Sequence, residues 1–498
     1  MSDVHRACDP AGRAEDGART GGGGRPAHGD RPWAEFGARL RSLRRRAGLT
    51  QLQLGQLVGY HHTLISKLES GLREPAAGLA DRLDPLLGAG GELSALAGAP
   101  RTAGSPGVLS EAVGRALFAP LPGDGFLPGG GALPDDGTGD GERAWPVRLP
   151  DREVICPLHA SEGCSVPEPA FVRGLLKESP EGLRAVPETE AVHGFTALLG
   201  RLTQGAAEDR PPGAPETAEH VLHLVVGWAR QVNASGRLPH AQLRLAAAYA
   251  QLAGQLRMAR GQAAVSTAWL AHGLRWAGAS DDVISQASLL GDLCTLVRLD
   301  RDAASALVYA QAMAALDPRR VWVTALAHLY QARAYALRQD GPECRRHIAL
   351  ARRGLARLDR RDGAEAPWLT GADGRMRAES AVAGALRDLA AGTGDRATAR
   401  RAVTATAESL AHLAPRMRPA RLLLTLRLAD SHACAGDLEA ALDVATPVVE
   451  QAVHSEQSTT VHELRGLHSR LTAGWGSLSQ VRDYRERVRA AAATAGLP

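Results

Sequence analysis

The chain contains 498 residues, carries a formal net charge of +4 and has an ordinary share of hydrophobic residues, 44%. This length is enough for about three domains with hydrophobic cores. No apolar run reaches the roughly 18 residues of a membrane span, and the N-terminus lacks the apolar stretch of a signal peptide, so we expect a cytoplasmic protein without membrane contact. Aromatic residues make up only 4% of the chain, which favours Ala- and Leu-rich helix packing over a β-sandwich.

The N-terminal segment is rich in glycine and charged side chains. Such a composition cannot bury enough apolar surface to fold, so residues 1–30 are predicted to form a disordered tail. A first helix is expected next, because Phe36, Leu40 and Leu43 share one helical face. Residues 31–97 are predicted to form a small domain of five helices.

Residues 48–75 read GLTQLQLGQLVGYHHTLISKLESGLREP, which predicts two short helices joined by a glycine turn. Thr50 can cap the first of these helices, and Gln53 three residues later completes a capping box. Gly55 is expected where two helices cross closely, and Gly59 where the first helix ends. The segment therefore has the outline of a helix-turn-helix.

The second helix of this pair is the third helix of the domain. We expect it to open at His61 or His62 and to turn Ile65 and Leu68 inward. Its remaining face is polar and can enter a DNA major groove. That face consists of His62, Thr63, Ser66 and Lys67.

From about residue 36 to residue 87 the chain resembles the XRE (Cro/CI-type) helix-turn-helix regulators of bacteria and phages. The most specific matching stretches are GLTQ at 48–51, VG at 58–59, ISKLE at 65–69 and GLREP at 71–75. The resemblance implies that the outer face of the third helix reads DNA bases and that Gln51 contacts a phosphate. Gly55 replaces the more usual alanine, and a His-His pair stands where Ser, Gln or Thr are common, so no DNA sequence preference carries over.

The basic side chains of the protein are concentrated around this motif. Residues 31–75 hold eight cationic and three anionic side chains, a net charge of +5, whereas the whole chain is only +4. A local basic patch is what binding to a phosphate backbone requires, although a solvated helix face also explains Arg-rich helix ends. We predict that phosphates are contacted by Gln51, Arg44, Arg45 and Arg73.

The amino-acid composition changes after residue 97. Residues 98–150 are rich in Gly and Pro and show neither a helical nor a strand period, which predicts a flexible linker. Residues 151–215 are predicted to be irregular and partly helical, because prolines interrupt their short helical stretches.

Residues 216–498 show helical periodicity almost throughout, in pairs of amphipathic helices joined by short turns. Small residues recur at corresponding places in these pairs: Ser266, Ala306, Cys344, Ala399 and Ala441. The longest interval contains residues 359–375, which we predict to be a surface insertion. The pattern resembles the tetratricopeptide repeat (TPR), which implies an α-solenoid with a concave groove for a peptide or protein ligand. The predicted fold is all-α, with a small five-helix DNA-binding head, a flexible linker and a C-terminal TPR-like α-solenoid.

The sequence contains no motif that predicts catalysis, since a P-loop, a GxSxG nucleophile elbow and an HExxH helix are all missing. Six cysteines are too few for a disulfide framework in a cytoplasmic chain. Cys156, His159 and Cys164 have some metal-binding character, but they lack a clear fourth ligand. We therefore expect neither enzyme activity nor a cofactor or metal.

We predict a sequence-specific transcriptional regulator that binds double-stranded DNA. A homodimer is expected, because a single small head buries little surface and dimers of this class bind two half-sites. The alternative is a TPR-type interaction scaffold whose head is vestigial or binds DNA without specificity. We expect a vestigial head to lose its turn glycine or to bury a charge in its core, and the sequence indicates neither.

Overall fold

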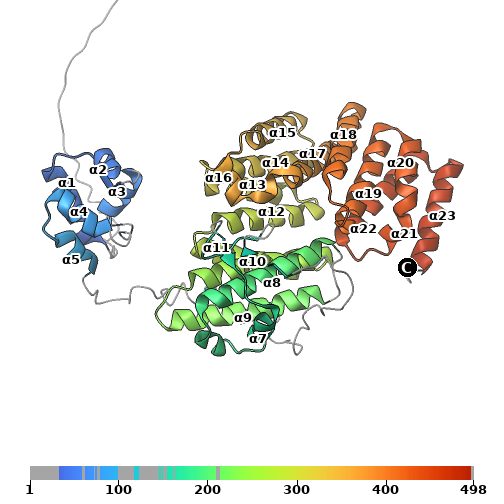
Figure 1. Cartoon of the computed structure of the whole chain (residues 1–498). Coiled ribbons are helices and arrows are strands. Elements are labelled where there is room, and N and C mark those ends of the chain that lie inside the picture. Colours follow the sequence, from blue (N-terminus) through green and yellow to red (C-terminus); the bar gives the residue numbers. More distant parts are fainter. Residues whose placement is uncertain are drawn as a thin grey trace, which may run out of the picture. The chain divides into compact units, whose positions relative to one another are not determined.

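A computed structural model describes residues 33–58, 62–71, 73, 75, 79–98, 117–122, 145–146, 148–149, 154–160, 163–208 and 213–494. The chain separates into two compact units, which we call the head (residues 1–104) and the body (residues 105–498). The described residues are almost entirely helical (Figure 1), which confirms the predicted all-α class. None of the described helices has both the length and the apolar character that crossing a bilayer requires.

The described part of the head consists of five helices, as the sequence predicted. They are α1 (Ala34–Arg46), α2 (Gln51–Val58), α3 (His62–Glu69), α4 (Leu79–Leu87) and α5 (Glu92–Gly98). Their apolar faces meet in one small core, in which Phe36, Leu40, Leu54 and Ile65 are buried. Apolar residues at helical spacing thus produce five short helices that are stable only against one another.

Two local features fix the start of α2 and the packing of α3 against α1. Thr50 and Gln53 form the predicted capping box: the Thr50 N–H donates to Gln53 Oε1 (2.9 Å), and the Gln53 N–H donates to Thr50 Oγ1 (3.2 Å). Helix α1 meets the end of α3 at Gly37, where an added Cβ would lie 2.8 Å from the carbonyl oxygen of Glu69. Gly37 is therefore the residue that lets two helices approach closely. This role was predicted for Gly55, which is also buried.

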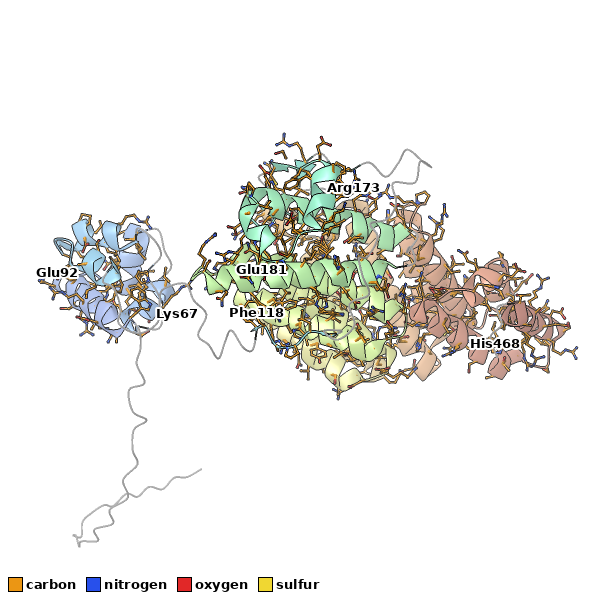
Figure 2. All side chains as sticks on the ribbon, turned by 90° about the horizontal axis from the view of Figure 1, so that it is seen from below. Lys67, Glu92, Phe118, Arg173, Glu181 and His468 are labelled. Atoms are coloured by element: carbon orange, nitrogen blue, oxygen red, sulfur yellow. The ribbon has the colours of Figure 1, made fainter. Side chains whose placement is uncertain are left out.

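The body includes a stretch that the sequence analysis placed in the linker of residues 98–150. Leu117 is buried in the body core, and its carbonyl oxygen accepts a hydrogen bond from Trp276 Nε1 (2.8 Å). The guanidinium of Arg230 lies 5.8 Å from the ring centre of Phe118, which Figure 2 labels. This part of the predicted linker is therefore packed structure, and the remainder lies largely outside the described residues.

Residues 151–215, predicted to be irregular and partly helical, contain one short strand, two short helical elements and one long helix. The strand β2 (Cys164–Ser165) pairs antiparallel with β1 (Arg148–Leu149), which lies just before this range, and Leu149 is opposite Cys164. They are followed by α7 (Pro169–Leu175), the 3-10 turn η1 (Gly182–Ala185) and α8 (Glu188–Glu208). Helical structure thus precedes residue 216, where the repeat domain was predicted to begin.

From α9 (Ala214–Ala234) onward, helices adjacent in the sequence pack side by side (Figure 1). The pairs are α10 (His240–Ala259) with α11 (Ala263–Ala279), α12 (Val283–Leu299) with α13 (Ala303–Leu316), α14 (Val321–Leu337) with α15 (Gly341–Leu355), α17 (Gly371–Thr393) with α18 (Arg396–His412), and α19 (Arg418–Ala435) with α20 (Leu438–Ala445). The last elements are the 3-10 turn η3 (Thr446–Val448), α21 (Val449–Val453), α22 (Ser458–Trp475) and α23 (Ser479–Thr494). This arrangement confirms a C-terminal helical repeat region.

The small residues that suggested the repeats hold one structural position. Each is buried at the fourth residue of the second helix of a pair: Ser266, Ala306, Cys344, Ala399 and Ala441. In four of these pairs the second helix starts after an aspartate whose side chain accepts a backbone N–H, namely Asp302, Asp340, Asp395 and Asp437. The aspartate caps the helix start, and the small side chain lets the two helices approach.

The prediction that residues 359–375 form a surface insertion is wrong. It contains α16 (Arg360–Glu365) and the 3-10 turn η2 (Pro367–Leu369), followed by the first turns of α17. Its residue Leu369 is buried in the body core. Glu365 accepts hydrogen bonds from Trp322 Nε1 (2.9 Å) and Arg320 Nε (2.7 Å), so the segment is an integral part of the body.

Candidate nucleic-acid interface

Helix α3 has a polar outer face and an apolar inner face, as the sequence predicted. The exposed side chains of the predicted base-reading set are those of His62, Ser66 and Lys67. Figure 2 labels Lys67 on the head. Ile65 and Leu68 are fully buried on the opposite side. Thr63 also belongs to α3, but its side chain lies outside the described residues.

The last residue of α3, Glu69, is a buried carboxylate with several donors around it. Arg44 donates to it from Nε and from Nη2 (3.0 Å), and Gln51 donates from Nε2 (2.8 Å). Arg41 Nε lies 3.4 Å from the same carboxylate. Burial raises the pKa of Glu69, but the hydrogen bonds from Arg44 and Gln51 outweigh it and hold that pKa below its usual value. The carboxylate therefore stays charged and ties α3 to α1 and α2.

This arrangement corrects the predicted role of Arg44. Its side chain is buried, and its third hydrogen bond goes from Nη1 to the carbonyl oxygen of Leu49 (2.7 Å). All three guanidinium nitrogens thus have partners inside the head, so Arg44 stabilises the fold and is not placed to contact a phosphate. The hydrogen bond between the side chains of Arg44 and Glu69 raises the pKa of Arg44.

Gln51 both stabilises the interior of the head and lies where a phosphate contact is possible. Its Nε2 donates to Glu69, so this donor faces the interior of the head. Gln51 is also the first residue of α2, where backbone N–H groups have no partner within the helix. A phosphate contact at this position would therefore use the backbone of the helix start.

The predicted basic patch is smaller than the sequence count of eight cations indicated. Arg39 forms an ion pair with Glu92, and Arg44 is buried against Glu69. Arg31 lies outside the described residues. Among the described residues of the stretch 31–75, the exposed cations without such a carboxylate are Arg45, Arg46, Lys67 and Arg73. These include two of the three arginines predicted to contact phosphates.

The expectation that this head has no buried charge is wrong. Besides Arg44 and Glu69, the core contains Asp84, whose carboxylate accepts the backbone N–H groups of Leu93 and Ser94, each at 2.9 Å. Each of these buried charges has hydrogen-bonding partners, which removes most of the cost of burial. The turn residue Gly59 lies outside the described residues, so this criterion no longer separates a working head from a vestigial one.

The roles of Glu69 and Gly37 were not predicted from the sequence, although the position of Glu69 carries a signal. Glu69 follows Ile65 by four residues and Leu68 by one, which places it at the edge of the buried face. A carboxylate there requires a cationic partner, and the Arg-rich end of α1 offers several. Which arginine fills that role depends on how the two helices cross.

Comparison with known proteins supports the prediction made for the head and finds no match for the body. No curated protein matches the chain, and no solved structure does. Residues 35–97 match a family model described as a helix-turn-helix domain. This range contains all five helices of the head apart from the first and last residues of the set. The head is accordingly a helix-turn-helix domain, the class of DNA-binding unit that the sequence predicted.

Proposed function

We propose that this protein is a sequence-specific transcriptional regulator of the XRE type, which reads DNA with α3. In this proposal His62, Thr63, Ser66 and Lys67 meet base edges in the major groove. Arg45, Arg73 and the start of α2 contact phosphates and set the register of the head. The observation that carries the proposal is the polar face of α3, exposed on one side and fixed on the other through Glu69.

The electrostatics of the head favour the same function. Arg45, Arg46, Lys67 and Arg73 are exposed, whereas the anionic Glu69 of α3 is buried and paired with Arg44. Exposed cations attract the DNA backbone by releasing counterions, so binding should weaken with salt. Because one head covers only a short site, we propose that two chains bind a two-fold operator as a homodimer.

For the body we propose a TPR-type groove that binds a peptide or protein segment. A cavity of about 540 Å³ lies among α8, α10, α12 and the first turn of α19. Its lining combines apolar side chains with polar groups of Arg244, Gln251 and Gln255 and with the ring of Trp368. Cavities of this size and mixed lining are typical of ligand sites. A bound segment would give the regulator its signal.

The second candidate function, an interaction scaffold with a non-specific head, rests on this same cavity. Selection of bound sequences from random double-stranded DNA by the full-length protein separates the two. Enrichment of one two-fold motif is expected for the regulator. Binding that depends on salt but enriches no motif would contradict it and favour the scaffold.

A further inference from the structure

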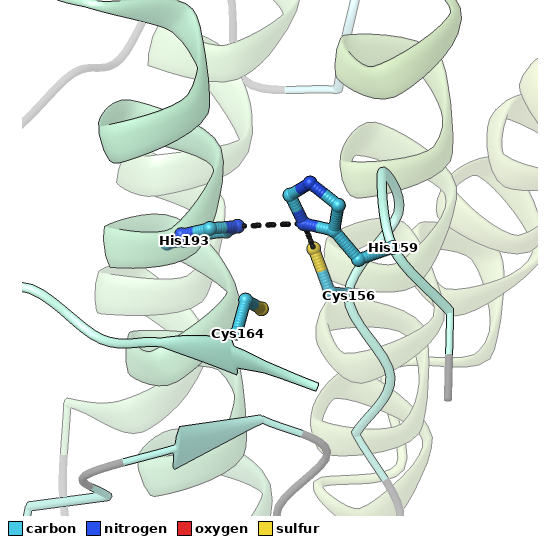
Figure 3. A group of neighbouring side chains, drawn as sticks. All are labelled: Cys156, His159, Cys164 and His193. Carbon is cyan, nitrogen blue, oxygen red and sulfur yellow. Dashed lines mark hydrogen bonds between the residues drawn. The ribbon is translucent and has the colours of Figure 1, made fainter. Parts of the chain in front are cut away.

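Four side chains with metal-binding atoms converge at one place in the body. Cys156, His159, Cys164 and His193 each offer one ligand atom, and these atoms all lie within 4.8 Å of one another. Figure 3 shows the two imidazole rings and the two thiols turned toward a common centre. Three of these residues, Cys156, His159 and Cys164, were recognised in the sequence, where no fourth ligand was evident. His193, which belongs to α8, supplies it.

Three separate elements hold the four residues in place. Cys156 and His159 belong to a tight turn that the Ala160 N–H closes by donating to the Cys156 carbonyl oxygen (2.9 Å). Cys164 stands on β2, which is paired with β1. His193 lies in the second turn of α8 and is buried. The backbone therefore brings the group together, without relying on long mobile side chains.

Two distances within the group match those of a tetrahedral zinc site. His159 Nδ1 lies 3.1 Å from His193 Nε2, and Cys156 Sγ lies 3.6 Å from His159 Nδ1. Ligand bonds of about 2.05 Å for nitrogen and about 2.3 Å for sulfur, at tetrahedral angles, separate two nitrogens by about 3.3 Å and sulfur from nitrogen by about 3.6 Å. These two pairs thus have the spacing of a coordination shell, and all the other pairs of ligand atoms lie within 4.8 Å.

The chemistry of the donors selects among metals. Two thiolates with two imidazoles form the soft, nitrogen-and-sulfur set that zinc takes in closed structural sites, and oxygen-preferring ions such as magnesium or calcium are excluded. The His193 ring also makes a hydrogen bond with the backbone of Ser165. Such a contact fixes the orientation of a ligand histidine.

We propose that Cys156, His159, Cys164 and His193 bind one zinc ion in a closed Cys₂His₂ site. The ion joins the turn at 156–160 and β2 to helix α8, so its role is structural. Cys156 and Ala160 also line the 540 Å³ cavity, so the zinc site shapes one wall of the proposed ligand groove. The proposal does not depend on the DNA-binding function of the head.

The test is the zinc content of the purified full-length protein, measured by mass spectrometry of the metal. We expect one zinc per chain. Replacement by Co²⁺ should produce the visible absorption of a tetrahedral site together with a thiolate-to-cobalt charge-transfer band. Cys164→Ser and His159→Ala should each weaken zinc retention against a chelator by at least about tenfold. Cys434→Ser, which removes a partly exposed thiol that is not part of the cluster, should leave zinc retention unchanged.

Two results would overturn the proposal. One is a protein prepared under reducing conditions that takes up neither zinc nor cobalt. The other is metal binding that survives in both ligand variants, or is lost equally in Cys434→Ser. A Cys156–Cys164 disulfide that persists under those reducing conditions in place of metal, detected by peptide mass, would have the same meaning as the first result. The stoichiometry of the wild-type protein decides the matter even if a ligand variant fails to fold.

Discussion

Glu69 at the end of α3 and Arg44 in the last turn of α1 form a buried, two-pronged ion pair. The pair connects the helix proposed to read bases with the helix that supports it. Since Gln51 at the start of α2 donates to the same carboxylate, one side chain fixes the relative orientation of three helices. The polar face of α3 is thus oriented from the interior of the head.

The first prediction concerns this pair. Glu69→Gln removes the negative charge and leaves Arg44 buried without a counter-charge. Breaking a buried ion pair in this way costs about 3–5 kcal/mol, which is close to the whole stability of a small domain. Hydrogen exchange of the full-length protein should show protection lost across the head and retained in the body.

Arg45→Ala is the matched control for that measurement, because Arg45 adjoins Arg44 in the sequence but is exposed. Its effect on exchange should stay within about 0.5 kcal/mol. Unchanged protection in Glu69→Gln would show that the ion pair does not stabilise the head.

The second prediction separates base reading from phosphate contact. Lys67→Ala should cost about 1–3 kcal/mol at one operator position, since it removes a donor from a base edge. Arg45→Ala should weaken binding evenly across sequences and reduce the salt dependence by about one unit. Titrations of the selected operator and of single-base variants, at several salt concentrations, measure both effects. Identical losses on every DNA sequence would refute the division of roles.

The third prediction concerns a buried charge cluster in the body. Glu463 on α22 accepts from Arg387 of α17 (2.6 Å) and from Arg427 of α19 (3.0 Å). Asp430 accepts from Arg387 (2.7 Å) and Arg470 (2.7 Å). Glu463→Gln should lower the free energy of unfolding by about 3–5 kcal/mol, because two buried guanidinium groups lose their shared counter-charge. Urea denaturation of the full-length protein measures it.

The same buried carboxylate, Glu463, makes the folding stability fall at low pH. Burial raises the pKa of Glu463, but Arg387 and Arg427 outweigh it and hold the pKa far below its usual value of 4.5. A lowered folded pKa contributes stability above 4.5 that is lost as the pH falls toward the folded pKa. Glu463→Gln should flatten this acid decline, whereas the exposed Glu439→Gln should leave it as in the wild type. A decline of equal steepness in both variants would contradict the role of Glu463.

The fourth prediction has the opposite dependence on pH. Burial raises the pKa of Asp292 to about 6 from the usual 3.8, despite hydrogen bonds from Gln251 (2.9 Å) and Gln255 (3.0 Å). A raised folded pKa means that stability present below pH 3.8 is lost as the pH rises through about 6. Asp292→Asn should therefore gain stability relative to the wild type between about pH 4 and pH 7.

Urea midpoints measured at both ends of that range test this prediction. The exposed Asp443→Asn serves as the control and should keep the pH dependence of the wild type. If Asp292→Asn follows the same pH dependence as the control, Asp292 does not titrate between the two values.

The sequence by itself determined the elements and their faces. Helical spacing predicted the five head helices and the inward Ile65 and Leu68, because a helix places residues three and four apart on one side. The recurring small residues predicted the helix pairs for a related reason. Each one, such as Ala306 or Ala441, is the fourth residue of the second helix of its pair, and four of the five helices are capped by an aspartate.

Only the tertiary structure decided which distant groups meet. Arg44 and Glu69 are 25 residues apart, and His159 and His193 are 34 apart, so no local pattern joins them. Leu117 lies in a Gly/Pro-rich stretch, yet its carbonyl meets Trp276, 159 residues further along the chain. Such contacts depend on how already formed helices pack, which short-range periodicity does not encode. One arginine was thereby moved from the predicted DNA surface to the interior, and three candidate metal ligands acquired a fourth.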